Sequence, residues 1–378
     1  MKILYQFASQ FVASSCYEAI EGTTHVDYDA YMLKYNHGVD GYYAMLVDYA
    51  VEATLFTSAG VESTAFKGNY KANTSLGNAY AVLYAKRIYA TATYALGVGH
   101  TIFSNCPQGT TIYKLHVGAL FNIAIAGSIN SLKFGTSGST ITIGSTSYNS
   151  YSLTMDGYPV YGSTVPSSST ATSNSSLITV NGSATASVYL YGQVCLRYGY
   201  AANGGALNVA NASATVYVQC DIKYCNAYYG GAIYNNGGTV NFGPSSRKEI
   251  YSNKAFYGAG IYNNAGTLQM GSSYAYIIGN TATSSGGSSS AYGGAIYFKA
   301  GTFAFSAGYI GASGSANTAT YGGGIYQAGG TITMSNTTPR IRYNTANLYG
   351  GGVYINSGTF YYNGGYIEYN KTTSTSTG

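Results

Sequence analysis

Two carboxylates in the middle of the chain are the clearest candidates for acid–base chemistry. Asp221 and Glu249 each lie eight residues before a repeated Tyr-Gly motif, which begins at Tyr229 and Tyr257. If equivalent residues of neighbouring units lie above one another, the two carboxylates form an outward column about 4.8 Å apart. Glycosidases need two acids about 5–9.5 Å apart, so the two carboxylates could act on a glycan. The alternative is a surface charge ladder in which Lys223 offsets both carboxylates, and the lack of an evident cleft favours this alternative.

A column of five tyrosines is the clearest candidate for ligand binding. Each follows an aliphatic residue that is expected to point inward, so the tyrosine ring is expected to point outward. An aromatic stripe along a rigid rod can stack on sugar rings or bind a protein. The alternative is a ladder that supports itself, with each ring packed on the ring below. The five residues are Tyr234, Tyr262, Tyr297, Tyr326 and Tyr354.

Other residue types that carry chemistry have no productive spacing. Neither the histidines nor the odd number of cysteines fits a zinc site or a disulfide framework, and no glycine-rich loop is followed by Lys-Ser or Lys-Thr as in a phosphate site. The sequence therefore predicts no metal and no cofactor. The residues concerned are His25, His37, His100, His116, Cys16, Cys106, Cys195, Cys220 and Cys225.

The candidate residues belong to a repeat that fills the second half of the chain. The motif is YGGAIY or a close variant, at 229–234, 257–262, 292–297, 321–326 and 349–354. Successive starts differ by 257−229 = 28, 292−257 = 35, 321−292 = 29 and 349−321 = 28 residues. The long step contains a Ser/Gly insertion at 284–290, which is expected to be an exposed loop.

Each repeat contains three short apolar segments, which predicts three strands per coil. The second segment alternates strictly between apolar and polar residues, as a strand with one buried face does. Stacked coils turn the repeat alignment into vertical columns of side chains. The expected interior columns are Val240, Leu268, Phe303, Ile332 and Phe360, then Phe242, Met270, Phe305, Met334 and Tyr362, and then Ile250, Ile277 or Ile278, Ile310, Ile341 and Ile367.

Glycine and asparagine mark the corners between the segments. Paired glycines such as Gly230-Gly231 indicate a corner where a Cβ would clash or φ must be positive. An Ile-x-x-Asn pattern predicts a second corner, in which asparagine is expected to adopt the left-handed conformation and stacked amides form a ladder. The asparagines are Asn253, Asn280, Asn344 and Asn370. The unit at Ile310 lacks this asparagine, so we expect the ladder to be interrupted there.

Composition excludes several classes of protein. Only 8% of the 378 residues are charged, against about 25% in a typical soluble chain, so an ordinary helical enzyme is not expected. The 17 basic and 12 acidic residues give a net charge of +5, and the bases are scattered, which argues against a nucleic-acid partner. No apolar run is long enough to span a membrane, and residues 1–7 make only a poor export signal.

The repeat resembles a known group of proteins. GGAI motifs that alternate with a hydrophobic-x-x-Asn motif are similar to the repeats of polymorphic outer-membrane proteins and related autotransporter-type adhesins. The resemblance covers about residues 200–378, although most x-x-Asn motifs here begin with Ile rather than Phe. It implies a right-handed parallel β-helix of the pectin-lyase-like kind. It also implies a secreted or outer-membrane-associated adhesive protein that acts in virulence.

The sequence thus predicts an all-β parallel β-helix with about 28 residues per coil, in three regions. Residues 1–95 form an irregular or mixed lead-in or cap, in which residues 42–56 can form a helix. Residues 96–200 form irregular coils, with strands at 141–143, 153–157, 177–180 and 188–190, and residues 201–378 form the regular coils.

Three functions fit this organisation. The first is a non-enzymatic adhesin that binds a host or environmental glycan or a surface protein weakly and multivalently. The second is a polysaccharide lyase or glycoside hydrolase of the same fold, with its site before residue 225. The third is a structural spacer. A smooth rod favours the adhesin, and a cleft with convergent acids favours the enzyme.

Overall fold

A computed structural model of the protein describes part of the chain. Side chains are described within 165–166, 176–183, 185–192, 194–284 and 290–374, apart from residue 186. Before residue 165 the backbone of strands is described at 31–37, 40–47, 82–85, 88–90, 100–102, 110–113, 121–125, 129–134, 140–143, 146–149 and 153–156.

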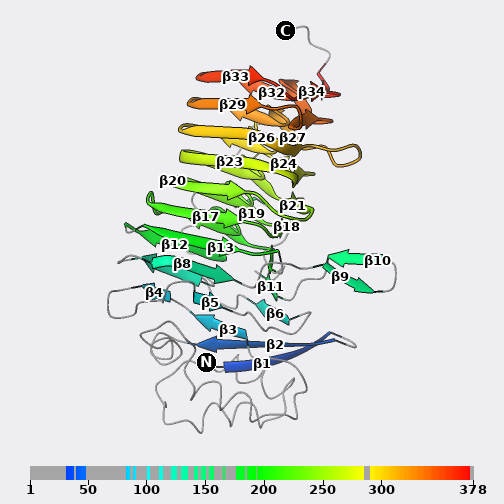
Figure 1. Cartoon of the computed structure of the whole chain (residues 1–378). Coiled ribbons are helices and arrows are strands. Elements are labelled where there is room, and N and C mark those ends of the chain that lie inside the picture. Colours follow the sequence, from blue (N-terminus) through cyan, green and yellow to red (C-terminus); the bar gives the residue numbers. More distant parts are fainter. Residues whose placement is uncertain are drawn as a thin grey trace.

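The described repeats form a parallel β-helix, as predicted. Each coil adds strands to two parallel sheets, and the coils stack along one axis from the green to the red end of the chain (Figure 1). None of the described residues is helical. No described segment is a helix of the length and apolarity that crossing a membrane requires. The register joins residues about 28 apart, for example Ile233 to Ile261.

The smaller sheet has seven strands, one per coil, and five of them (β15, β19, β22, β27 and β31) end just before a glycine corner. The three segments predicted from the sequence did not include this strand. Its members are β15 (Tyr200–Asn203), β19 (Asn226–Tyr229), β22 (Lys254–Tyr257), β24 (Thr281–Ala282), β27 (Thr318–Tyr321), β31 (Thr345–Tyr349) and β35 (Lys371–Thr372).

The larger sheet holds the three predicted segments of each coil. In β20 and β23 these segments run on as continuous strands. From residue 178 its members are β12 (Ile178–Gly182), β13 (Ala186–Leu190), β14 (Val194–Arg197), β16 (Leu207–Val209), β17 (Ala214–Val218), β18 (Asp221–Lys223), β20 (Ile233–Phe242), β21 (Lys248–Tyr251), β23 (Ile261–Ile278), β25 (Ile296–Phe298), β26 (Thr302–Ile310), β28 (Ile325–Gln327), β29 (Thr331–Ser335), β30 (Arg340–Arg342), β32 (Val353–Ile355), β33 (Thr359–Asn363) and β34 (Tyr366–Glu368).

The earlier strands are described as backbone only. The larger sheet continues into β4 (Ile88–Ala90), β5 (His100–Ile102), β6 (Thr110–Tyr113), β7 (Phe121–Ile125), β8 (Ile129–Phe134) and β11 (Leu153–Asp156). Outside it lie β1 (Tyr31–His37), β2 (Asp40–Val47), β3 (Val82–Ala85), β9 (Thr140–Ile143) and β10 (Thr146–Asn149).

Two expectations for this part of the chain are wrong. Residues 42–47 lie in β2, which pairs with β1 and β3, so they form a strand and no helix. Residues 141–143 lie in β9, which pairs antiparallel with β10 and projects to one side of the coils (Figure 1). The short link between β9 and β10 favours a local hairpin over a coil. The rest of residues 42–56 lies outside the described residues.

The interior columns are the predicted ones. Val240, Leu268, Phe303 and Ile332 are paired in register and buried. The third column runs through Ile277, and not through Ile278. In the last described coil Tyr362 and Ile367 occupy interior positions but are exposed, because no described coil covers them.

The glycine corners meet both predicted requirements. Gly230 has φ +66°, which costs a residue with a side chain far more than it costs glycine. A Cβ on Gly231 would lie 2.3 Å from the carbonyl oxygen of Ala259 in the next coil. The first glycine is therefore required by the backbone conformation, and the second is required by the close approach of neighbouring coils.

The asparagine ladder is continuous, and the predicted interruption is wrong. Asn317 takes the missing place, because the segment after Ile310 loops out and returns to the corner. Asn280 Nδ2 donates to Asn317 Oδ1 over 3.0 Å, and Asn317 Nδ2 donates to Asn344 Oδ1 over 2.9 Å. The left-handed residue is also one place earlier than predicted, as at Tyr343 with φ 57°. The amides are thereby free to bond to the backbone, as in the 2.8 Å bond from Asn280 Nδ2 to the Ile250 carbonyl.

The predicted insertion loop at 284–290 lies largely outside the described residues. The cysteine and histidine positions before residue 165 also lie outside the part of the chain whose side chains are described.

Candidate ligand-binding face

The five predicted tyrosines form one stacked column, here called the inner column. Each lies in register with the next, from β20 through β23, β25 and β28 to β32. Neighbouring ring centroids are 5.4, 4.9, 5.0 and 5.2 Å apart, and the ring planes are within 18° of parallel. The members are Tyr234, Tyr262, Tyr297, Tyr326 and Tyr354.

A second tyrosine column, here called the outer column, lies beside the first, and the sequence analysis missed it. Its rings are 5.3, 5.4, 5.3 and 5.9 Å apart and stacked. The signal was present, because the YGGAIY motif begins as well as ends with tyrosine. The corner between the two tyrosines turns the chain so that both rings lie on the same side. The members are Tyr229, Tyr257, Tyr292, Tyr321 and Tyr349.

The two columns interlock with a shift of one coil. The ring of Tyr229 meets Tyr262 edge to face at 5.0 Å, and Tyr292 meets Tyr326 in the same way at 5.1 Å. Edge-to-face and stacked contacts are both favourable for aromatic rings. The ten tyrosines, together called the tyrosine face, therefore form one packed surface over five coils.

Two of the five rings of the inner column are almost fully buried, and the other three are partly exposed. Tyr262 is 5% exposed and Tyr326 is 9% exposed, because outer-column rings lie across them. Tyr349, at the end of the outer column, is 42% exposed. Along the axis each ring face is covered by the next ring. The tyrosine face can thus offer ring edges and phenol hydroxyls to a ligand, but few open ring faces on which a sugar could stack.

Burial raises the pKa of two phenol groups of this surface, so that both stay protonated at physiological pH. Burial, followed by the neighbouring phenols Tyr228 and Tyr229, raises the pKa of Tyr257 to about 12. Burial and the stacked Tyr297 raise the pKa of Tyr262 still further. Neutral phenols both donate and accept hydrogen bonds, so the face can serve a neutral polar ligand.

Below the tyrosine face the same register positions hold asparagines. Asn203 aligns with Tyr229, and Asn208 aligns with Tyr234. Within the described residues, the aromatic surface therefore starts at the coil of Tyr229.

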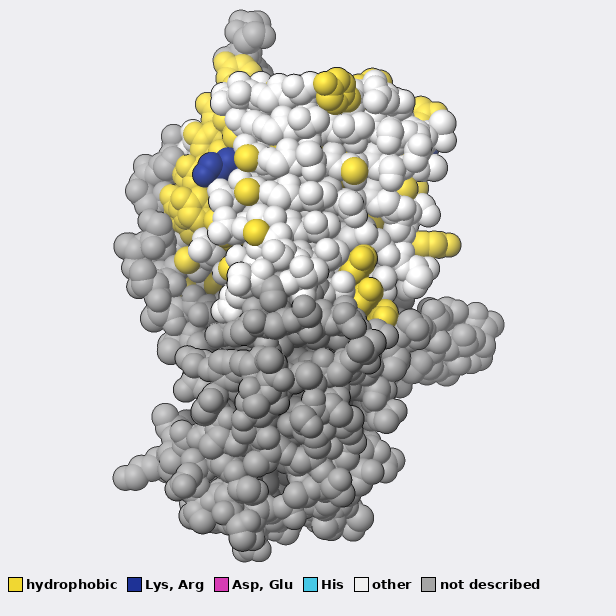
Figure 2. Space-filling view, turned by 60° about the vertical axis from the view of Figure 1, so that its left-hand side comes forward, with side chains coloured by type: hydrophobic (Ala, Val, Ile, Leu, Met, Phe, Trp, Pro, Cys, Tyr) yellow, Lys and Arg dark blue, Asp and Glu magenta, His cyan; other side chains and the backbone are white. Residues whose placement is uncertain are grey.

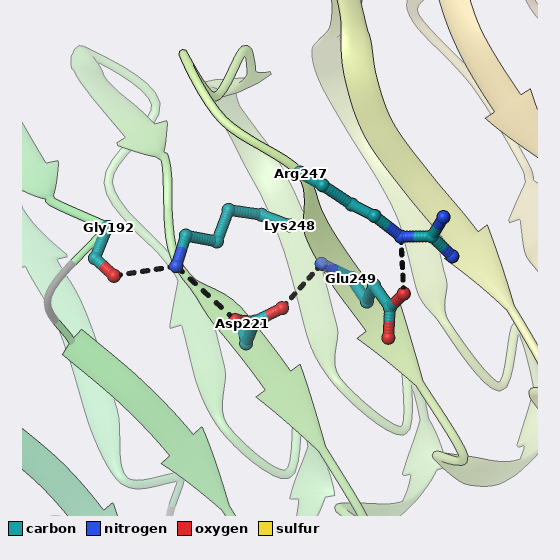
Figure 3. A network of polar contacts seen from close by, with 5 residues as sticks. All are labelled: Gly192, Asp221, Arg247, Lys248 and Glu249. Atoms are coloured by element: carbon teal, nitrogen blue, oxygen red, sulfur yellow. Dashed lines mark hydrogen bonds and ion pairs between the residues drawn. The ribbon is translucent and has the colours of Figure 1, made fainter. Parts of the chain in front are cut away.

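The predicted carboxylate pair is adjacent but is not open to a substrate. Asp221 Oδ1 accepts the backbone N–H of Glu249 over 2.6 Å, so the two residues lie in neighbouring coils as predicted. The Asp221 side chain is only 3% exposed, and its Oδ2 lies 3.5 Å from Lys248 Nζ (Figure 3). The expectation that Asp221 points into solvent is therefore wrong. Glu249 instead pairs with Arg247, 2.9 Å away.

Lys248 was the unforeseen member of this network. It begins β21 at an interior position and is fully buried. Its Nζ donates to the carbonyl of Gly192, two coils below, over 2.8 Å (Figure 3). A buried ammonium needs such partners, and Asp221 supplies the opposite charge. Lys248 is thus the buried charge partner of Asp221, Arg247 is a charge partner of Glu249, and the carboxylate pair is not placed for acid–base work on a glycan.

The cysteines of the described coils are buried in the packed interior. Cys195, Cys220 and Cys225 are buried and form no disulfide. Burial, followed by the nearby Asp221, raises the pKa of Cys195 to about 12, which suppresses its reactive thiolate. Cys225 fills an asparagine position of the corner ladder and accepts the Gly199 N–H on its sulfur. Among the described residues, no three acidic, histidine or cysteine side chains are grouped as a metal would require.

The described surface carries few charges. On the side shown in Figure 2, the coloured part displays apolar side chains, few basic ones and no acidic ones.

Comparison with protein families, with curated proteins and with solved structures finds no match for the chain.

Proposed function

We propose that the protein is a non-enzymatic adhesin whose coils form a rod, and that the tyrosine face is its binding surface. The observation that carries the proposal is the repetition of ten tyrosines in two interlocked columns over five coils. The rings of the outer column recur once per coil, with centroids 5.3 to 5.9 Å apart. A ligand with its own short repeat would meet the same contact several times.

Weak contacts of this kind gain strength by repetition. One phenol hydrogen bond contributes about 1 kcal/mol in net terms, and each further contact along a tethered ligand forms at high effective concentration. An extended glycan or an extended segment of a surface protein fits this requirement. The ligand is bound by hydroxyls and ring edges, because the ring faces are covered by their neighbours.

The resemblance of the repeats to polymorphic outer-membrane proteins and autotransporter-type adhesins supports the same proposal. On that basis we propose that the protein acts at the cell surface, associated with an outer membrane, or is secreted, with a role in virulence. A right-handed, pectin-lyase-like β-helix is part of the same proposal.

A structural spacer is the second candidate function, and the burial of Tyr262 and Tyr326 favours it. Rings that are almost fully covered stabilise the rod whether or not a ligand binds. The two roles are compatible, since the inner column can support the outer column that meets the ligand.

The proposal is tested by incubating the full chain with arrays of immobilised glycans and of extracellular-matrix proteins, with a parallel assay for saccharide cleavage. The adhesin is supported by binding that rises with ligand length and by the absence of cleavage. Cleavage of any bound saccharide, or no binding to any ligand on either array, would overturn it.

A further inference from the structure

A second cluster of aromatic side chains, mixed with arginine, lies on the outward side of the third segment of each coil. Tyr276, Tyr309, Arg340 and Tyr366 are in register on β23, β26, β30 and β34. They alternate with the buried column of Ile277, Ile310 and Ile341 and therefore face outward. This segment is separate from the Ile-Tyr segment that carries the inner tyrosine column.

The aromatic rings of this cluster lie between guanidinium groups. Arg247 lies over the ring of Tyr276 at 4.1 Å, and Tyr276 stacks on Tyr309 at 4.5 Å. Arg342 covers the other side, 4.7 Å from the Tyr309 centroid. Arg340 lies over Tyr366 at 4.1 Å. We call these six residues the arginine–tyrosine cluster.

The cluster holds positive charge that the protein does not neutralise in full. The described residues contain nine basic and three acidic side chains, a net of 9−3 = +6, which exceeds the +5 of the whole chain. Arg247 is paired with Glu249, whereas Arg340 and Glu368 are 3.7 Å apart and partly exposed. Among the described residues Arg342 has no ion pair, and its Nε is buried without a hydrogen-bond partner.

Stacking fixes what these arginines can bind. A guanidinium whose flat face rests on a ring keeps its N–H groups in the plane, where they can donate two parallel hydrogen bonds to a carboxylate or a sulfate group. Arg247 and Arg340 are three coils apart, about 14 Å at one strand spacing per coil. An extended polymer with acidic groups at short intervals could reach both.

We propose that the arginine–tyrosine cluster is a second binding site and that its ligand is an acidic polysaccharide, with sulfate or carboxylate groups on its sugars. The arginines bind its anionic groups, and the tyrosine rings hold the guanidinium groups in position. Three arginines spread among tyrosines are too few and too far apart for the dense phosphate contacts of a nucleic-acid site. The site is independent of the tyrosine face.

The test measures binding of the full chain to immobilised dextran sulfate and polygalacturonate, with neutral dextran and double-stranded DNA as comparisons. We expect binding to at least one acidic polysaccharide but not to dextran, and we expect added salt to weaken it. Replacing Arg340 and Arg342 together by Gln should lower the affinity about tenfold or more. Arg342→Lys keeps the charge but loses the planar guanidinium group, so it should lower the affinity almost as much as replacing Arg342 by Gln does.

Matched controls remove two lysines outside the cluster, Lys254→Gln and Lys299→Gln, and should leave the affinity within about twofold. Urea unfolding midpoints of all variants show whether any loss comes from unfolding. Equal losses in the lysine and arginine variants, unchanged affinity of R340Q/R342Q, or DNA binding as tight as polysaccharide binding would each overturn the proposal. Replacing Tyr292, Tyr321 and Tyr349 by phenylalanine should not change the affinity for the acidic polysaccharide. The two proposed sites can therefore fail independently of each other.

Discussion

The rings of Tyr262 and Tyr297 stack with centroids 4.9 Å apart and planes 3° from parallel, although 35 residues separate them in the chain. That step contains the Ser/Gly insertion at 284–290, and the two rings still stack across it. The tyrosine ladder is therefore a property of the coil register, and it is kept where the repeat length changes.

Removing a buried ring of this ladder should destabilise the coils. Tyr262 is 5% exposed, and replacement of a buried aromatic residue by Ala costs about 3–5 kcal/mol. Tyr262→Ala should therefore lower the urea unfolding midpoint strongly. Tyr274→Ala is the matched control, since Tyr274 is 52% exposed. Equal midpoints for the two variants would show that the inner column is not a packed ladder.

The corner ladder depends on amide donors and not on shape alone. In Asn280→Asp the carboxylate can no longer donate to Asn317 Oδ1 or to the Ile250 carbonyl, and a buried charge is created. We expect a loss of about 3 kcal/mol or more in unfolding free energy at neutral pH. Asn347→Asp, at an exposed position, should cost less than about 0.5 kcal/mol. Thermal and urea unfolding of both variants measure the loss of stability. An unchanged unfolding midpoint for Asn280→Asp would contradict the role of the amide donors.

The buried ion pair should behave as a unit. Asp221→Ala removes the opposite charge beside the buried Lys248 ammonium and should cost about 3–5 kcal/mol. Adding Lys248→Met removes the stranded charge and should restore most of that loss. A double-mutant cycle by urea unfolding measures the coupling. Additive effects of the two substitutions would mean that the pair is not coupled.

Alkaline pH should unfold the coils by way of the tyrosine face. The pKa of Tyr257 is raised by burial to about 12, while an unfolded tyrosine titrates near about 10. The folded state thus favours the neutral phenol, so the unfolding free energy is unaffected below about pH 10 and falls as the pH rises from there toward 12. Burial of Cys195, which raises its pKa to about 12, acts in the same direction.

This dependence is followed by urea midpoints and by ultraviolet absorbance of tyrosinate at a series of pH values. We expect part of the tyrosine absorbance to change only as the coils unfold. Complete ionisation near the pKa of free tyrosine, with the coils still folded, would contradict the packing of the face.

Periodicity made the fold predictable from the sequence. An error of one residue in register would have moved Val240 or Phe303 out of the core, so the alternation fixes which side chains face inward. The glycine corners followed from the same alignment, since the φ of Gly230 is local and the close approach at Gly231 is to the equivalent corner of the next coil, which the repeat predicts. These inferences needed only neighbouring residues and a repeat.

The candidate sites were harder, because they depend on contacts between coils that differ in sequence. Lys248 donates a hydrogen bond to Gly192 two coils below, and the repeat pattern does not predict that contact. Asn317 restores the corner ladder from outside the Ile-x-x-Asn spacing, which a fixed spacing rule cannot detect. The outer tyrosine column was visible in the letters, but the turn at the glycine corner decides that it lies beside the inner column.

The most direct test of the proposed binding surface replaces Tyr292, Tyr321 and Tyr349 by phenylalanine, singly and together, and measures the affinity for the ligand that the arrays identify. Phenylalanine keeps the stacked rings but removes the hydroxyls. The account predicts a stepwise loss of affinity, about fivefold for each hydroxyl removed, with an unchanged urea midpoint. Affinity that stays constant through the triple variant, in a protein that remains folded, would contradict it.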